Sequence, residues 1–215
     1  MNHKEEAAFL KEKLEEAQYV LIGIGGEWRI TGSLWDPPNK EQKNAYHQLY
    51  QWVGKKDYFV VTTLTDGGIY ETEFDQERLV APCGNIHWRQ CSLACTKDIW
   101  EEGEVADEIC PHCKAPLVEN TIQAEHYIEE GYLPKWREYR KWLTRTLNRN
   151  LVVLELGEGF LTPTVIRWPF EKTVFFNQKS WLFRVNAQLS QTPSEIKERA
   201  VSVAENSIMF INAFI

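Results

Sequence analysis

The sequence predicts a protein of the α/β class, with a Rossmann-like, doubly wound parallel sheet and an inserted small zinc-ribbon lobe. Three observations predict this fold. Short β-rich runs alternate with longer helical patterns along most of the 215 residues, as they do in a parallel sheet with crossover helices. Several of the β-rich runs are apolar on both faces, which is expected of strands that helices cover. Residues 85–125 break the alternation and hold most of the cysteines.

The expected strands are short runs rich in β-branched and aromatic residues. They are YVLIGIG at 19–25, YFVVTTL at 58–64, LVVLEL at 151–156, TVFFN at 173–177 and WLFRVN at 181–186. Because several of these runs lack a polar face, we expect their sheet to lie between two layers of helices.

The expected helices fill the spaces between these runs. They cover residues 3–17, 40–54 and 130–148. A last helix is expected in TPSEIKERA, with Thr192 as the N-cap, Pro193 as the first helical residue and Glu195 at the third position. The apolar C-terminus, IMFINAFI, fits either a final strand or a dimer contact.

Composition narrows the classes of function. The chain has 24 Lys and Arg against 31 Asp and Glu, a formal net charge of -7, so a nucleic-acid backbone would be repelled. Basic residues cluster only at 135–149, which is typical of the solvated face of a helix. The N-terminus lacks the apolar centre of a signal peptide, and no run of about 18 apolar residues occurs. We therefore expect a cytoplasmic protein that binds neither nucleic acid nor membrane.

The strongest local signal is the spacing of four cysteines. Cys91 and Cys95 form one pair and Cys110 and Cys113 the other, in the pattern C-x3-C-x14-C-x2-C. Four thiolates on two tight turns can close a tetrahedron around Zn²⁺ and stabilise a lobe too small to bury a core. Two disulfides are disfavoured in a cytosolic chain, and four ordinary buried thiols would make the spacing a coincidence. The zinc is expected to be structural, because four thiolates leave no open position.

The chain is long enough for one sizeable core. Its residues are 43% apolar, with nine tryptophans, which suggests one domain with an insertion. We expect residues 1–84 and 126–215 to form the large domain, and residues 85–125 to form the inserted zinc-ribbon lobe.

Several motifs, in their order along the chain, resemble the sirtuin (Sir2-like) family. They are GIGGE, YFVVTTLTD, RLVAPCGNIHWRQCSLAC, CPHC and LELGEGFLTPTVIRWPF. The closest resemblance is to the macrodomain-linked branch (class M), whose members have a similar LELGxGFxTP run. It extends from about residue 18 to about residue 190. The resemblance implies NAD as a co-substrate and a protein substrate, and this branch is associated with protein ADP-ribosylation instead of lysine deacylation.

The resemblance assigns cofactor-binding roles to residues that follow the expected strands. The candidates are Gly23, Gly25, Gly26, Arg29, Thr63, Gly157, Gly159 and Asn186. Glycines let the backbone approach a diphosphate closely, although a glycine pair after a strand is more often a tight turn. Arg29 is the nearby cation that could pair with phosphate. Asn186 fits either the adenosine ribose or a turn at the end of a strand.

Two carboxylates depart from the family pattern in the phosphate-binding turns. Glu27 stands where the family has a small hydroxyl residue, and Glu158 lies between the two glycines of the second turn. A carboxylate directed at a diphosphate weakens its binding, unless both side chains turn toward solvent. The family's cofactor-covering D-F-R segment has no counterpart in residues 28–42. These departures predict a degenerate or re-purposed nucleotide site.

The candidate catalytic residues are Asp66 and Cys83. The family motif T-Q-N-x-D corresponds to TTLTD at 62–66, so Leu64 replaces the orienting asparagine while Asp66 is kept. Cys83 stands at the family's histidine base, where the macrodomain-linked branch carries glutamine. Cys83 could act as a base or nucleophile or simply fill a buried position, and Asp66 could bind ligand or stabilise a turn. His87 cannot replace the base, because about 13 Å of extended chain separates it from Cys83.

The sequence supports two hypotheses for function, one for an enzyme and one for a binding protein. The first is an NAD-dependent transferase that acts on protein side chains, with ADP-ribosyl transfer favoured over lysine deacylation. The second is a catalytically inactive pseudo-sirtuin that acts as a zinc-containing binding or scaffold protein. The second predicts an exposed apolar surface around Trp28, Trp35 and Trp168 that a partner protein covers.

Overall fold

The computed structural model describes residues 3–30 and 37–213. Its main body is a six-stranded parallel sheet with the strand order β3-β2-β1-β7-β8-β9. The strands are β1 (Tyr19–Ile24), β2 (Asp57–Thr62), β3 (Leu79–Val80), β7 (Leu151–Leu156), β8 (Ser180–Val185) and β9 (Ala200–Val203). The α-helices are α1 (His3–Glu16), α2 (Lys40–Val53), α3 (Leu133–Arg145), α4 (Arg167–Phe176) and α5 (Ser207–Asn212).

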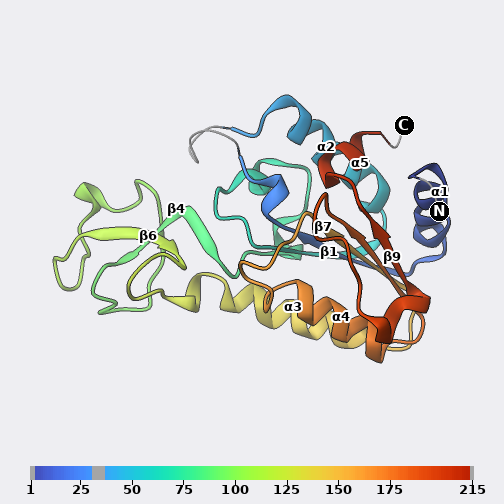
Figure 1. Cartoon of the computed structure of the whole chain (residues 1–215). Helices are drawn as coiled ribbons and strands as arrows, with labels where there is room; N and C mark the ends of the chain where they lie inside the picture. The colour runs from blue at the N-terminus through green and yellow to red at the C-terminus, as the bar shows by residue number, and fades with distance from the viewer. Residues whose placement is uncertain (1–2, 31–36, 214–215) are drawn as a thin grey trace.

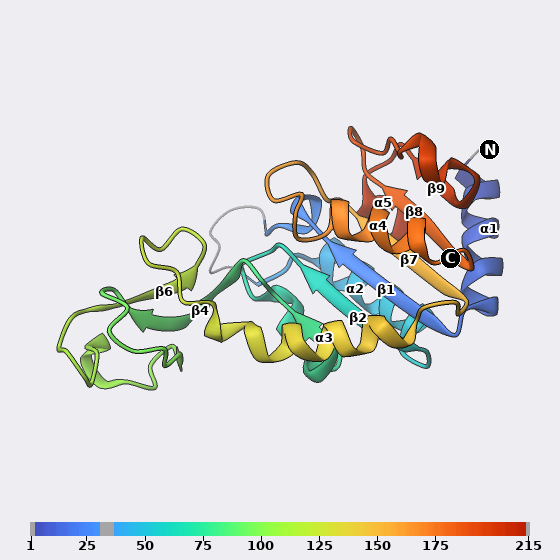
Figure 2. The same cartoon turned by 90° about the horizontal axis from the view of Figure 1, so that it is seen from below.

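Helices cover both faces of this sheet (Figures 1 and 2). Helices α1, α2 and α5 bury apolar side chains on one face, and α3 and α4 bury theirs on the other. Strand β1 shows the cause: Ile22 and Ile24 face the first group of helices, while Leu21 faces the second. The absence of a polar face in YVLIGIG therefore follows from burial on both sides.

A second, antiparallel sheet projects from the body and contains the cysteine-rich segment (Figure 1). Its strands, in the order β5-β4-β6, are β5 (Trp100–Glu101), β4 (Gly84–Cys91) and β6 (Leu117–Thr121). Helix α3 begins beside this lobe and runs along the body (Figure 2). The division of the chain at residues 85 and 125 stays a prediction.

The α/β class with a parallel sheet is confirmed, and so are most of the expected elements. Strand β7 has the expected bounds, and β1, β2 and β8 lie within one or two residues of theirs. The helix expected at 130–148 is shorter, because a 3-10 turn at Glu129–Gly131 precedes α3.

The strand expected in TVFFN is wrong, because these residues belong to α4. Phe170 and Val174 are one helical turn apart and both fully buried against the sheet, whereas Phe175 and Phe176 are exposed. The helical spacing of buried residues outweighs the β propensity of the sequence TVFF.

The helix expected in TPSEIKERA is also wrong. The segment forms a 3-10 turn over Ser194–Arg199 that begins after Pro193, with no side-chain cap from Thr192. Strand β9 follows directly at Ala200, so the chain has no room for a longer helix there. Ile196 is buried and fixes the turn against α4.

Ser207–Asn212, near the C-terminus, form helix α5, so the alternative of a final strand is wrong. Asn206 caps the helix by accepting hydrogen bonds from the backbone N–H groups of Ile208 and Met209. The alternative of a dimer contact stays a prediction. None of the helices within the described ranges has the length and apolar character to cross a membrane.

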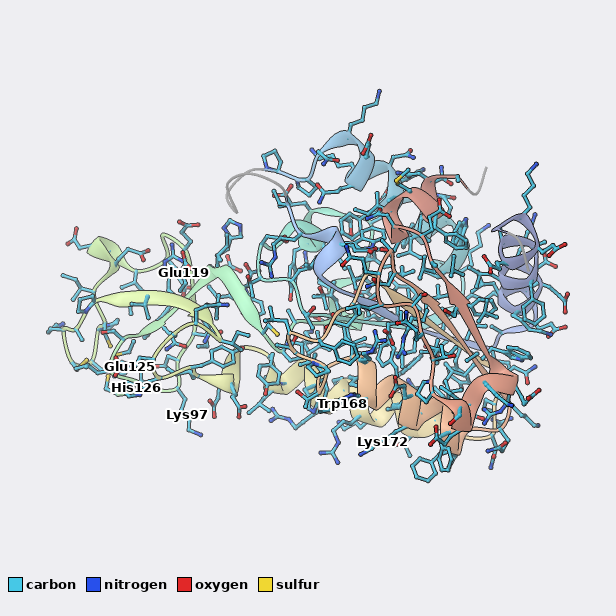
Figure 3. All side chains as sticks on the ribbon, in the orientation of Figure 1. Lys97, Glu119, Glu125, His126, Trp168 and Lys172 are labelled. Atoms are coloured by element: carbon cyan, nitrogen blue, oxygen red, sulfur yellow. The ribbon has the colours of Figure 1, made fainter. Side chains whose placement is uncertain are left out.

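The exposed tryptophan surface is contradicted for one of its three residues. Trp28 is only 1% exposed, and its indole Nε1 donates to Ser207 Oγ at 3.0 Å. Trp35 lies outside the described residues. Trp168, on α4, is 47% exposed and labelled in Figure 3.

Candidate functional site

The candidate site lies along the carboxyl edge of the parallel sheet. The last residues of four neighbouring strands lie side by side in the sheet. They are Thr62 of β2, Ile24 of β1, Leu156 of β7 and Val185 of β8. Gly25, Thr63, Gly157 and Asn186 each follow one of these strand ends. Strands β1 and β7 flank the point where the chain reverses its direction across the sheet, which is where open α/β sheets bind ligands.

Glu158 lies at the centre of this row. A Cβ on Gly25 would overlap the carboxylate and the backbone of Glu158, so only glycine allows this contact. Thr63 Oγ1 donates to Glu158 Oε2 at 2.7 Å. Glu158 is 2% exposed, and burial raises the pKa of its carboxyl to about 7, with Thr63 opposing the rise.

Glu27 is turned away from this centre, toward α5. Its carboxylate accepts hydrogen bonds from the backbone N–H and the hydroxyl of Ser207, both at 2.7 Å. A third bond comes from the backbone N–H of Ala187 at 2.8 Å. Glu27 therefore joins the first loop to the start of α5, and its carboxylate is held by these bonds and does not point freely into solvent.

Two side chains hold the turns around Glu158. Asn186 donates from Nδ2 to the Glu158 carbonyl at 3.0 Å, and its Oδ1 accepts from the backbone N–H groups of Gln188 and Leu189. Arg167 donates to the same Glu158 carbonyl at 3.3 Å and to the Leu189 carbonyl at 2.9 Å. Asn186 thus has the geometry of a turn residue, and its expected contact with ribose stays a prediction.

Arg167 belongs to a buried charge network that the sequence reasoning missed. Arg184 donates twice to the carboxylate of Glu155, at 2.7 and 2.8 Å, and also pairs with Glu171. Arg167 contacts Glu155 at 3.3 Å. The available signal was the presence of charged residues within the apolar runs of β7, β8 and α4, where a charge must find a partner.

Cys83 is buried next to the same centre. Burial raises the pKa of its thiol to about 11; a side-chain hydrogen bond with Thr162 opposes the rise and the Glu158 carboxylate adds to it. The thiol is therefore protonated at neutral pH, which is a poor state for a base or nucleophile. Leu64, which replaces the family's orienting asparagine, packs its side chain into the apolar core.

Asp66 is engaged by its own turn. Its two carboxylate oxygens accept hydrogen bonds from the backbone N–H groups of Ile30, at 3.2 Å, and Gly68, at 3.1 Å. This geometry fits the stabilisation of a turn, one of the two roles expected for it. Its role with a ligand stays a prediction.

The remaining cofactor-binding candidates lie outside the group of contacts around the Glu158 carboxylate. They are Gly23, Gly26, Arg29 and Gly159. A Cβ on Gly23 would lie 2.5 Å from Ile166 and 2.6 Å from Phe170, so this glycine allows close packing of α4 on β1. A Cβ on Gly26 would meet nothing within 4 Å, and one on Gly159 would make an ordinary contact with Leu189 at 3.9 Å. Within the described residues, no side-chain bond joins the exposed Arg29 to the cluster.

The four cysteines form a separate metal-binding geometry in the lobe. All four Sγ atoms lie within 4.8 Å of one another, and the Cys91–Cys113 and Cys95–Cys110 separations are 3.4 and 3.6 Å. A disulfide would need about 2.05 Å, whereas Zn–S bonds of about 2.3 Å place tetrahedral thiolates roughly 3.8 Å apart. The geometry is compatible with zinc and contradicts the disulfide alternative.

Comparison with known proteins places this geometry among sirtuin folds. No family model matches the chain. A Sir2 structure with a p53 peptide and NAD+ has a TM-score of 0.63 at 15% identity, over 99% of this chain and 97% of that one. A Sir2Tm structure bound to a propionylated peptide gives a TM-score of 0.62 at 14% identity, over 99% and 97% of the two chains. The predicted resemblance to sirtuins is thus confirmed at the level of the fold.

Two curated proteins are similar in sequence. One is a protein ADP-ribosyltransferase of Staphylococcus aureus, 23% identical over 180 residues, which are 75% of this chain and 57% of the relative. The other is a probable bifunctional ADP-ribose hydrolase/ADP-ribosyltransferase of Fusarium oxysporum, 28% identical over 60% of this chain and 26% of the relative. The chain thus spans little more than half the length of the first relative and about a quarter of the second.

Proposed function

We propose that this chain, which has the sirtuin fold, is an NAD-dependent transferase that moves ADP-ribose to protein side chains. The observation that carries the proposal is the row of loop residues at the carboxyl edge of β1, β2, β7 and β8, at the switch point of the sheet. The similarity to two proteins named as ADP-ribosyltransferases supports transfer over deacylation.

The residues of the row suit a dinucleotide. Gly25 and Gly26 allow a diphosphate to approach the backbone, Thr63 offers a hydroxyl, and the loop after Asn186 borders the same edge. NAD supplies the ADP-ribosyl group and nicotinamide as the leaving group. The chain's own residues then bind the nucleotide, exclude water and orient the acceptor.

Zinc is proposed as the structural metal of the lobe. Cys91, Cys95, Cys110 and Cys113 would hold it, because their four Sγ atoms lie within 4.8 Å of one another and four thiolates complete a tetrahedral zinc site. We also propose a cytoplasmic location, where such thiols stay reduced.

The second candidate is a pseudo-sirtuin that binds a protein without transfer. The observation that favours it is apolar surface just beyond the Glu158 turn. Leu161 is 82% exposed and Phe160 56% exposed, and the exposed Trp168 follows on α4 (Figure 3). An acceptor protein could contact the same residues, so this surface fits both functions.

Two measurements on the zinc-loaded protein separate the candidates. Calorimetric titration with ADP-ribose tests the nucleotide site, and nicotinamide release from NAD in the presence of acceptor proteins tests transfer. Binding together with release supports the transferase. Binding without release argues against transfer. The absence of binding at millimolar ligand across pH 5.5 to 8.5 contradicts the transferase and is the outcome that the pseudo-sirtuin predicts.

A further inference from the structure

We propose that Glu158 must take up one proton before a nucleotide diphosphate can occupy the site, so that Glu158 is this chain's own ligand-selecting residue. The inference rests on the proposed function, because it concerns the same nucleotide site. The role of Glu158 follows from the burial of its carboxylate and from the contacts of that carboxylate with Gly25 and Thr63.

The position of Glu158 makes its carboxyl unavoidable for such a ligand. Glu158 follows Gly157 in the turn after β7, and its carboxylate fills the space against Gly25 in the turn after β1. Thr63, after β2, bonds to the same carboxylate at 2.7 Å. A diphosphate that approaches the glycine turn therefore meets this carboxyl at short range.

The surroundings of Glu158 offer its charge no ion pair. Arg167, from α4, donates to the Glu158 carbonyl and to Glu155, and no salt bridge to the Glu158 carboxylate occurs in the described part of the chain. Glu155, from β7, cannot pair with the Glu158 carboxylate because it is itself an acid. The thiol of Cys83, from the segment before β4, is neutral at pH 7 and supplies no positive charge. Glu27 faces α5.

Proton uptake follows from these contacts. Burial raises the pKa of Glu158 to about 7, so a small fall in pH or a small further rise of this pKa neutralises the carboxyl. A bound diphosphate adds negative charge nearby and raises this pKa further, because like charges disfavour ionisation. By linkage, whatever favours the protonated carboxyl in the complex makes affinity fall as pH rises.

The test is calorimetric titration of the zinc-loaded full chain with ADP-ribose between pH 5.5 and 8.5. The ligand's diphosphate keeps its charge in this range, so it contributes no pH dependence of its own. For the wild type, we expect Kd to increase about tenfold per pH unit above roughly pH 7, with close to one proton taken up at pH 8. Glu158→Gln keeps the size of the side chain and removes its charge, so its Kd should stay flat near the wild type's low-pH value.

Two further variants sharpen the test. Glu125→Gln changes an exposed glutamate on the lobe (Figure 3) and should keep the wild-type slope. Thr63→Val removes the donor that favours the ionised carboxyl, so the slope should begin at a higher pH.

Each outcome decides a claim. A wild-type Kd that does not change with pH, or a pH slope that persists in Glu158→Gln, overturns the role of Glu158 while leaving the nucleotide site intact. If neither protein binds ADP-ribose at any pH, the proposed function fails and this inference fails with it. Tight, flat binding by Glu158→Gln together with a sloping wild type supports both.

Discussion

Glu158 combines deep burial with an ionisable group and therefore affects stability as well as binding. A carboxyl whose folded-state pKa is raised to about 7 from 4.5 contributes its full stability below pH 4.5 and loses it as pH rises through 7. Relative to its stability below pH 4.5, the wild type should therefore lose roughly 3 kcal/mol at pH 8 through ionisation of Glu158. In urea unfolding at pH 5 and pH 8, Glu158→Gln should lose less stability than the wild type. Equal losses in both proteins would contradict the raised pKa.

Cys83 gives a second prediction at the scale of one side chain. A buried thiol with a pKa of about 11 is almost entirely protonated at pH 7.5, and only thiolates react quickly with alkylating agents. The zinc-loaded protein should leave Cys83 unmodified by iodoacetamide over hours, as read by peptide mass spectrometry. The same residue should react within minutes in urea, which serves as the control. Rapid labelling of the folded protein would contradict the raised pKa and support a reactive thiolate at Cys83.

The close packing of α4 on β1 depends on Gly23. A methyl group there would lie 2.5 Å from Ile166 and 2.6 Å from Phe170, so the helix would have to move away from the sheet. Gly23→Ala should cost about 1 to 3 kcal/mol of unfolding free energy, measured by urea denaturation. The matched control is Gly26→Ala, whose Cβ meets nothing within 4 Å. Similar losses for both variants would mean that the loss in Gly23→Ala does not come from the packing of α4 on β1.

The elements differ in how well the sequence predicts them, for physical reasons. YVLIGIG and LVVLEL are predicted because strands covered on both faces must be continuously apolar. TVFFN has strand-forming residues, yet α4 places Phe170 and Val174 on the sheet, and only tertiary contacts decide between the two. Strands β4 and β6 escape prediction, because the lobe has a small apolar cluster and no repeating pattern. The candidate site residues come from the resemblance to sirtuins, and their cofactor-binding roles stay predictions. The direction of Glu27 depends on α5, which the sequence does not reveal.

At the scale of the whole molecule, the parallel-sheet body and the lobe are stabilised by different means. The body has two extensive apolar clusters, one on each face of its sheet. In the lobe, the buried apolar cluster consists of Cys91, Cys110 and Leu117 with three partly buried neighbours, which is too small to fold a domain alone. The lobe should therefore depend on zinc, and the body should not.

Zinc removal tests this difference directly. After treatment with a strong chelator, we expect hydrogen exchange to accelerate throughout residues 84–121, because strands β4 and β6 lose the tetrahedron that joins their turns. Amides of β1 and β7 should keep their protection, since both strands lie inside the sheet with helices on both faces (Figure 2). Cys110→Ser, which removes one ligand, should show the same pattern without chelator. Loss of protection across the whole chain would mean that the lobe and the body unfold as one cooperative unit, joined through α3.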